Sequence, residues 1–151
     1  MRENKALRWL CLAGLFLVAG CGGGSDPVRG TIDEIARAAE KRDAPTVMQR
    51  LSPDFQAADG TGRADIETAL RGYFAGYDRL SVRISDLTIE RAAGAARARF
   101  RADLSGKPRQ VPGLDGWLPS TGSYRFDLRL SPDVRGRWLV TWAAWEQVAG
   151  R

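Results

Sequence analysis

The feature that most constrains the fold of this chain is a strict alternation of apolar and charged residues in its C-terminal half. Between Ala96 and Leu104 every second residue is apolar, and arginines and one aspartate lie between them. A two-residue period predicts a β-strand with one face in the core and the other in solvent. The pattern recurs along the chain and predicts four long strands, at residues 80–89, 96–104, 124–130 and 137–148.

The N-terminal half has helical periodicity instead. Asp26 and Pro27 are a typical cap and first-turn proline, and they predict a helix that ends near residue 42. Asp43 caps a second, short helix, and a third is predicted over residues 64–77. Helices followed by such strands predict an α+β fold, with the N-terminal helices packed on one face of a curved antiparallel sheet.

Two irregularities interrupt these patterns. Residues 52–54, Ser-Pro-Asp, predict a turn that breaks the second helix, after which Phe55 begins a short extended piece. At Ser85 and Asp86 the alternation slips by one residue. Such a slip predicts a β-bulge or a bend in the first long strand.

The first twenty-one residues have a different character. Three basic residues precede an apolar run from Trp9 to Val18, which is too short for a membrane-spanning helix of about 20 residues. A basic start, a short apolar run and small residues before a cut are the layout of a secretory signal. Val18-Ala19-Gly20-Cys21 resembles the lipobox of bacterial lipoproteins, which implies cleavage before Cys21 and lipid on that cysteine. The alternatives are an ordinary signal peptide with a chance cysteine, or an uncleaved anchor.

Cysteine usage agrees with a lipid anchor. Cleavage before Cys21 removes Cys11 and leaves one cysteine, which cannot close an internal disulfide. The glycines and serine at 22–25 predict a flexible tether of about 10–13 Å. The predicted organisation is a signal peptide over 1–20, a lipidated cysteine with its tether over 21–26, and one domain over 27–151. The lipoprotein resemblance places the chain in the cell envelope, and glycine after the cysteine favours the outer membrane, facing the periplasm.

Three stretches give the domain a resemblance to a known superfamily. They are IDEIARAAEKRDAPTVMQRLSPDF, ADIETALRGYFAGY and GRWLVTWAAWE. They resemble the opening helix pair, the third helix and the closing strand of the nuclear transport factor 2-like superfamily, which includes ketosteroid isomerases and polyketide cyclases. The resemblance implies a cone, in which a curved sheet wraps around helices and leaves an apolar pocket at its open end. It does not imply one activity, because the same cone serves as enzyme, ligand carrier and protein-binding module.

Composition excludes several kinds of chemistry. The chain has no histidine, which rules out histidine acid–base catalysis, Ser-His-Asp and Cys-His nucleophiles, and the usual zinc sites. It has no glycine-rich phosphate loop, so we expect neither a metal nor a cofactor. Removing residues 1–20 lowers the formal net charge from +5 to +3, which, with export, argues against a nucleic-acid partner. The tyrosine that ketosteroid isomerases carry on the first helix has no counterpart here, so we expect no catalytic residue.

Several charged residues are candidates for a catalytic base or for a lipid-binding surface. Asp54 would be a base at the cavity mouth, but its place in a Ser-Pro-Asp-Phe sequence predicts local hydrogen bonds in a turn instead. Asp127 lies on the charged face of its strand, where we expect it to pair with arginines. The basic residues of that face either form a solvated surface with Asp103 and Asp127 or meet anionic lipid headgroups; they are Arg97, Arg99, Arg101, Arg125 and Arg129.

Aromatic residues are the candidates for a binding site. Large rings with polar groups suit an apolar ligand that carries one or two polar atoms. Alternation places Trp138 and Trp142 on one face of the last strand and Trp145 on the other. At least one tryptophan therefore needs a second surface to pack against, and the superfamily resemblance implies that this surface is a homodimer interface. Plain core packing is the alternative. The predicted pocket residues are Tyr73, Tyr77, Tyr124, Trp138 and Trp142.

The irregular segment 113–122 carries Leu114, Trp117 and Leu118. These residues are predicted to cover the pocket as a lid, to contact a partner, or to hold the loop against its own domain.

Taken together, the sequence predicts a lipid-anchored periplasmic domain that binds a small apolar ligand or a protein partner near the membrane, without catalysis. One alternative is an isomerase, dehydratase or hydrolase that pairs a pocket carboxylate with a tyrosine. The other is an envelope assembly or interaction module.

Overall fold

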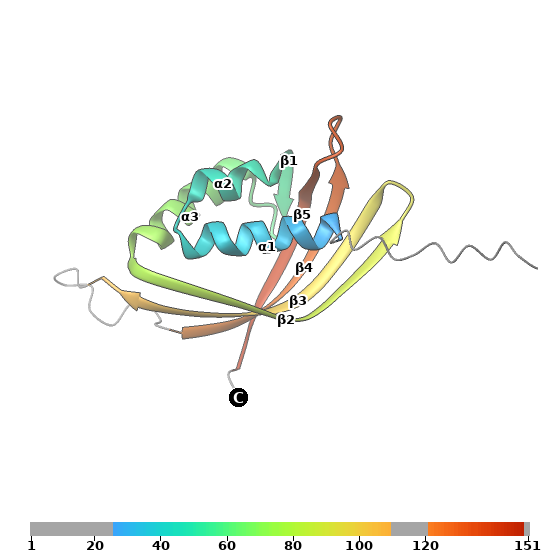
Figure 1. Ribbon diagram of the computed structural model, residues 1–151. Helices are drawn as coiled ribbons and strands as arrows, with labels where there is room; N and C mark the ends of the chain where they lie inside the picture. The colour runs from blue at the N-terminus through green and yellow to red at the C-terminus, as the bar shows by residue number, and fades with distance from the viewer. Residues whose placement is uncertain (1–25, 110–120, 150–151) are drawn as a thin grey trace, which may run out of the picture.

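The computed structural model describes residues 26–109 and 121–149. All the helices that it describes lie on one side of a curved sheet (Figure 1), which confirms the predicted α+β class. None of these helices is long and apolar enough to cross a membrane. The elements in chain order are α1 (Pro27–Glu40), α2 (Ala44–Gln49), β1 (Leu51–Ala57), α3 (Arg63–Ala75), β2 (Tyr77–Ala92), β3 (Ala95–Pro108), β4 (Thr121–Pro132) and β5 (Trp138–Val148).

The two N-terminal helices begin where the capping residues predict. The Asp26 carboxylate accepts a hydrogen bond from the backbone N–H of Val28 at 2.9 Å, and a proline occupies the first turn of α1. The Asp43 carboxylate accepts one from the backbone N–H of Thr46 at 3.1 Å and so starts α2. Each carboxylate satisfies a backbone donor that the first turn of a helix leaves unpaired.

The sheet has the order β1-β5-β4-β3-β2, and its last four strands form the predicted antiparallel meander. The sheet as a whole is mixed, because β1 pairs with β5 in parallel, and this parallel edge departs from the predicted antiparallel sheet. Residues 52–54 also belong to β1 rather than to a turn. The register with β5 shifts between Leu51 and Gln56, so this stretch bulges away from the ladder while its backbone stays extended.

Besides a register shift between Tyr77 and Arg79 at the start of β2, two bulges interrupt the long strands. The first lies between Ser85 and Thr88 of β2, with Asp86 at a φ of 55°, and it confirms the slip predicted there. The second lies in β5, where Val140 is opposite Leu130 but Trp142 is opposite Arg129, so the register skips one residue. A bulge of one residue exchanges the faces of all residues beyond it.

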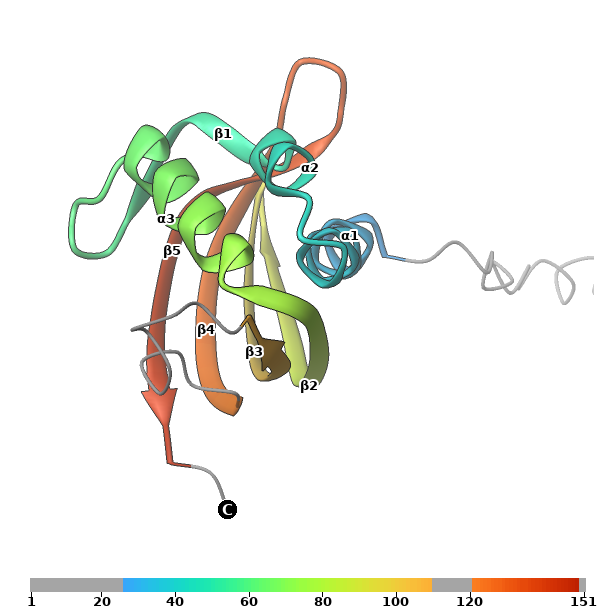
Figure 2. The same ribbon diagram turned by 90° about the vertical axis from the view of Figure 1, so that its left-hand side faces the viewer.

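The core lies between the concave face of the sheet and the helices (Figure 2). Val28 and Ile32 of α1 are fully buried against apolar residues of β3, β4 and β5, such as Ala98 and Leu130. A second, smaller cluster joins α1, α2 and α3 to the start of β2, around Phe74, Tyr77 and Leu80. This second cluster fixes the end of α3 against the sheet.

Candidate functional site

Tyr73 and Tyr77 contact each other on the concave side, and Tyr124 lies near them, at the end of the sheet where β2 begins and β3 ends. Tyr73 comes from the last turn of α3, Tyr77 from the start of β2 and Tyr124 from β4. The ring centroids of Tyr73 and Tyr77 are 5.0 Å apart, and Tyr124 is close enough to act electrostatically on Tyr73. These are all the tyrosines of the sequence, and we call them the tyrosine cluster. Tyr77 is fully buried, whereas the other two are half-buried.

Close backbone packing holds Tyr77 in place. Gly106 of β3 lies opposite Leu80 of β2, and a Cβ atom on Gly106 would be 2.6 Å from Cδ1 of the Tyr77 ring. Only glycine leaves room for the ring at this position. The Arg42 guanidinium also donates a hydrogen bond to the Tyr77 carbonyl at 2.9 Å.

The Tyr73 hydroxyl is held in its neutral form. Burial is the main cause that raises the pKa of Tyr73 above its ordinary value of 10, followed by a side-chain hydrogen bond with Tyr77. The charges that Tyr77 and Tyr124 would carry raise it further. A neutral phenol can donate to a carbonyl or hydroxyl of a ligand and accept from it, so the cluster suits an uncharged polar group.

A row of apolar rings continues from the tyrosine cluster across the concave face. Phe126 stacks on the buried Phe100, with ring centroids 5.2 Å apart and an interplanar angle of 14°. Its centroid lies 6.4 Å from that of Tyr124 and 6.4 Å from that of Trp145. Trp145 is 44% exposed. We call these four residues, together with the other two tyrosines of the cluster, the concave aromatic surface; its members are Tyr73, Tyr77, Phe100, Tyr124, Phe126 and Trp145.

The two predicted tryptophans lie elsewhere. Trp138 is at the other end of β5, where the Arg91 guanidinium lies 5.3 Å from its ring centroid. Trp142 is on the convex face, with the Arg129 guanidinium 4.4 Å from its ring centroid. The prediction that these tryptophans share a face is wrong, because the bulge in β5 moves Trp142 to the convex side and brings Trp145 to the concave side. Trp145 is therefore the aromatic residue that alternation alone missed.

The two candidate carboxylates also lie outside the concave aromatic surface. Asp54 is exposed on β1, and its backbone N–H donates to Ser52 Oγ at 3.3 Å. Asp127 is on the convex face and accepts from Arg97 Nε at 2.8 Å. That hydrogen bond is the main cause that lowers the pKa of Asp127, and it outweighs the opposing effect of desolvation. The expected pairing of Asp127 with an arginine is confirmed.

Three of the other arginines on the convex face are also paired. Arg99 forms an ion pair with Glu90, and Arg101 with Asp103. Arg125 pairs with Glu146, with 2.7 Å between nitrogen and oxygen. These pairs favour a solvated face of mixed charge over a dedicated anion-binding surface.

The remaining predicted residues, Cys21, Leu114, Trp117 and Leu118, lie outside the described residues. Within 26–109 and 121–149, no three potential metal ligands lie together.

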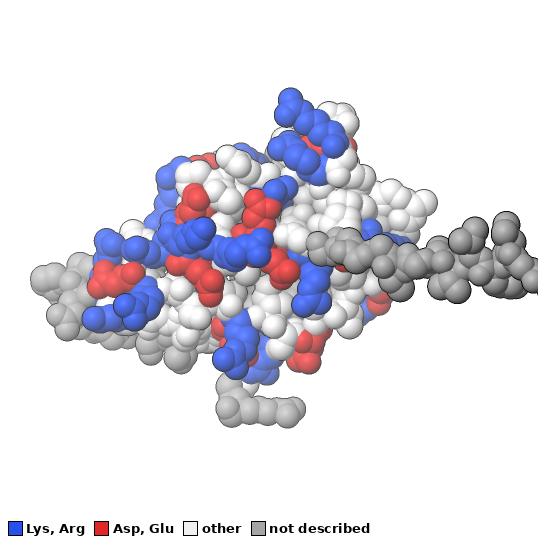
Figure 3. Space-filling view, in the orientation of Figure 1, with Lys and Arg blue, Asp and Glu red and all other residues white. Residues whose placement is uncertain are grey.

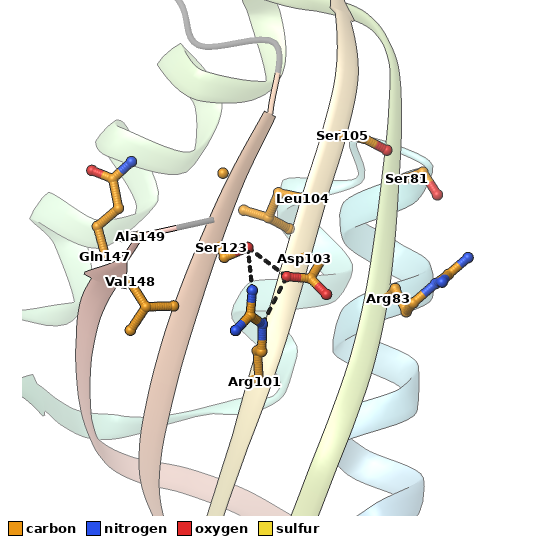
Figure 4. Close-up of a pocket in the computed structure, with 11 residues that line it drawn as sticks. Ser81, Arg83, Arg101, Asp103, Leu104, Ser105, Ser123, Gln147, Val148 and Ala149 are labelled. Atoms are coloured by element: carbon orange, nitrogen blue, oxygen red, sulfur yellow. Dashed lines mark hydrogen bonds and ion pairs between the residues drawn. The ribbon is translucent and has the colours of Figure 1, made fainter. Parts of the chain in front are cut away.

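A polar groove of about 760 Å³ opens on the convex face, and nothing in the sequence analysis anticipates it (Figure 4). Inside it, Arg101 donates to Ser123 Oγ at 2.9 Å and to Asp103 Oδ1 at 3.0 Å, and Ser123 donates to the same Asp103 oxygen at 2.5 Å. Hydrogen bonds from Ser123 and then Arg101 lower the pKa of Asp103. These three groups therefore satisfy one another, while Arg83 also lines the groove from β2. Ser81 and Ser105 line it from β2 and β3, and only the strand register reveals that they are neighbours.

Neither a protein-family model nor a curated protein sequence matches the chain. Solved structures do. A provisionally named scytalone dehydratase from Novosphingobium aromaticivorans matches with a TM-score of 0.68 and 12% identity, over 82% of this chain and 83% of that one. A nuclear transport factor 2-like superfamily protein from Salmonella enterica has a TM-score of 0.65 and 16% identity, over 82% and 89%. A provisionally named dehydratase of the same fold family from Streptomyces avermitilis has a TM-score of 0.65 and 12% identity, over 82% and 95%. Such identities establish a likeness of fold alone.

Proposed function

We propose that this chain, which has the nuclear transport factor 2-like fold predicted from its sequence, is a lipid-anchored ligand-binding domain of the bacterial cell envelope. Its concave aromatic surface binds a small, mainly apolar molecule that carries one hydroxyl or carbonyl group. The ligand's apolar part packs against Phe126 and Trp145, and its polar group hydrogen-bonds to Tyr73 or Tyr124. Binding without chemical conversion is the role that this surface supports best.

The observation that carries the proposal is that the neutral phenol of Tyr73, in contact with Tyr77, lies near a half-exposed aromatic row that includes Tyr124. Phe126 and Tyr124 are only half-buried, and Trp145 is 44% exposed. Covering such rings with an apolar ligand yields about 25 cal/mol for each Å² removed from water. The hydroxyls of Tyr73 and Tyr124 then give orientation, because a buried polar group on the ligand needs a partner.

The anchor in this proposal is the lipid on Cys21. Support comes from the basic start, the short apolar run, the small residues before the cysteine and the absence of a second cysteine in the mature chain. The described domain begins at Asp26, five residues after Cys21. Lipidation would therefore hold the domain at the membrane surface, and we expect the outer membrane, on its periplasmic side.

The competing function is a dehydratase or isomerase. Two of the matching structures bear dehydratase names, and a tyrosine is a suitable acid or hydrogen-bond donor for such chemistry. The reaction also needs a base beside the tyrosine, and the chain has no histidine. Asp54 and Asp127, the carboxylates proposed for that role, lie outside the concave aromatic surface. Binding therefore remains the better-supported function.

Native mass spectrometry of the mature protein from its host envelope tests the proposal first. We expect a reproducible extra mass of a few hundred daltons that denaturation releases. A clean apo mass for protein taken from that compartment would count against a carried ligand. The same spectrum weighs the modification on Cys21 and so tests the anchor separately.

Binding of 1-naphthol and naphthalene to the purified protein tests the site itself. One hydrogen bond between neutral groups contributes about 0.5–1.5 kcal/mol, so naphthol should bind about two- to twelvefold more tightly than naphthalene. Replacing both Tyr73 and Tyr124 with phenylalanine should abolish this preference and leave naphthalene binding intact. W145A should weaken both ligands, and W142F, on the convex face, is the matched control that should change neither. Equal affinities of the wild-type protein for the two ligands would contradict the role of the tyrosines.

A further inference from the structure

Two hairpin turns and the start of α1 form one end of the molecule. Arg91 of β2 lies opposite Ala96 of β3, which lies opposite Leu130 of β4, so the β2–β3 and β4–β5 turns are at the same end of the sheet (Figure 1). Arg91 forms an ion pair with Asp26, the cap of α1. We call this region the hairpin end, and it comprises residues 91–95 and 132–137.

The hairpin end combines exposed apolar groups with arginines. Val134, at the tip of the β4–β5 turn, is 103% exposed, the highest value among the large apolar residues that the structure describes as exposed. The neighbouring turn exposes alanines at positions 92, 93 and 95. Arg135 has no ion-pair partner in the described part of the chain, whereas Arg137 pairs with Asp133. Figure 3 shows the basic side chains gathered on the β4–β5 hairpin.

If Cys21 is lipidated, its position in the sequence determines which part of the domain lies next to the bilayer. Asp26 is five positions after Cys21, and five residue steps span at most about 18 Å when the chain is fully extended. Acyl chains on Cys21 would therefore keep Asp26 within about 18 Å of the lipid headgroups. Asp26 contacts Arg91 directly, so the hairpin end is the part of the domain that this tether brings to the bilayer.

We propose that the hairpin end is a membrane-contacting surface for a bilayer that contains anionic lipid. Val134 enters the headgroup region, and Arg135 lies against lipid phosphate. This assignment rests on the lipid anchor proposed above. A single apolar tip with an adjacent unpaired cation suits the interface of a bilayer, where apolar insertion and attraction to anionic lipid add together. A protein partner would call for a larger apolar patch than one valine and three alanines provide.

Site-directed spin labelling of the mature, lipidated protein tests the assignment. Nitroxides are placed by V134C at the hairpin end and by S105C, an exposed position toward the opposite end of β3. The protein is reconstituted through its own lipid into vesicles of phosphatidylethanolamine with phosphatidylglycerol. We expect the label at 134 to be several-fold less accessible to an aqueous nickel chelate than the label at 105, and more accessible to oxygen. Equal accessibility at both positions, or stronger shielding at 105, would overturn the assignment.

Two further comparisons separate the sources of shielding. Replacing Arg135 with glutamine should reduce the ratio of docked to undocked protein about fivefold, as expected for one basic residue at an anionic surface, and pure phosphatidylcholine should have a similar effect. Shielding that occurs in native membranes but not in lipid vesicles would identify a protein partner and overturn the bilayer. A mature chain whose mass shows no lipid on Cys21 would refute the anchor, and this proposal with it. Normal lipidation without shielding would refute the docking surface alone.

Discussion

Replacing Gly106 with alanine tests how the tyrosine cluster is built. A Cβ atom at this position would lie 2.6 Å from Cδ1 and 2.9 Å from Cε1 of Tyr77, and 2.9 Å from the carbonyl oxygen of Arg79. Neither neighbour can yield easily, because the ring is fully buried and the oxygen belongs to the backbone. The alanine must therefore push the Tyr77 ring out of its place beneath Tyr73.

The expected magnitude follows from two opposing effects. Overpacking a well-filled core typically costs about 1–3 kcal/mol. Alanine also restricts the unfolded chain, which offsets about 0.4–1 kcal/mol of that loss. The free energy of unfolding should therefore fall by about 1–2 kcal/mol. For a domain of this size the midpoint of thermal unfolding should fall by about 4–8 °C.

Urea and thermal unfolding of the mature chain, followed by tryptophan fluorescence, measure this change. The matched control is G72A, because Gly72 lies within α3 with no atom within 4 Å of a Cβ placed there. That variant should gain about 0.5–1 kcal/mol, as expected when alanine replaces a helical glycine. In a double-mutant cycle, G106A should be less destabilising when Tyr77 is already leucine, since the ring is then absent. A G106A variant as stable as G72A would refute the proposed contact.

Three other predictions concern charge and ring contacts. The pKa of Asp127 is lowered, so its contribution to stability is present above about pH 4 and is lost as the pH falls; D127N should flatten the acid limb of a stability–pH curve. The pKa of Tyr73 is raised, so its stabilising effect is lost only as the pH rises above 10; absorbance titration at alkaline pH should show a phenol that ionises late, and the absence of any such phenol would contradict the burial of Tyr73. R129A should change the emission of Trp142 and, as expected for an exposed cation–π pair, cost about 0.5–1 kcal/mol; an unchanged spectrum would refute that contact.

The sequence predicts those features of the fold that depend on neighbours along the chain. Asp26 and Asp43 reveal the starts of two helices because capping is decided within three residues. The slip at Ser85 and Asp86 reveals a bulge because it breaks the alternation visibly. The order of helices and strands then leaves few arrangements, and the meander of the last four strands is one of them.

Features that depend on register between distant segments are the ones that the sequence does not reveal. The parallel pairing of β1 with β5 joins Leu51 to Val140, and no local pattern encodes it. The bulge in β5 is hidden for a different reason: both faces of that strand carry tryptophans, so alternation reads equally well in either phase. Likewise, Ser105 and Ser123 look like ordinary polar positions until pairing of β2, β3 and β4 brings them to one groove.

The two ends of the molecule bear directly on how a ligand would reach the proposed site. The tyrosine cluster lies where β2 begins and β3 ends, which is the end of the sheet opposite the two hairpin turns. With the hairpin end on the bilayer, the tyrosine cluster faces away from the lipid. A ligand would then enter from the aqueous side rather than by direct transfer out of the bilayer. Naphthol should therefore bind the lipidated protein in vesicles with the affinity that it has for the detergent-solubilised protein, after correction for its partition into lipid. A large loss of affinity in vesicles would place the concave aromatic surface against the membrane and contradict this orientation.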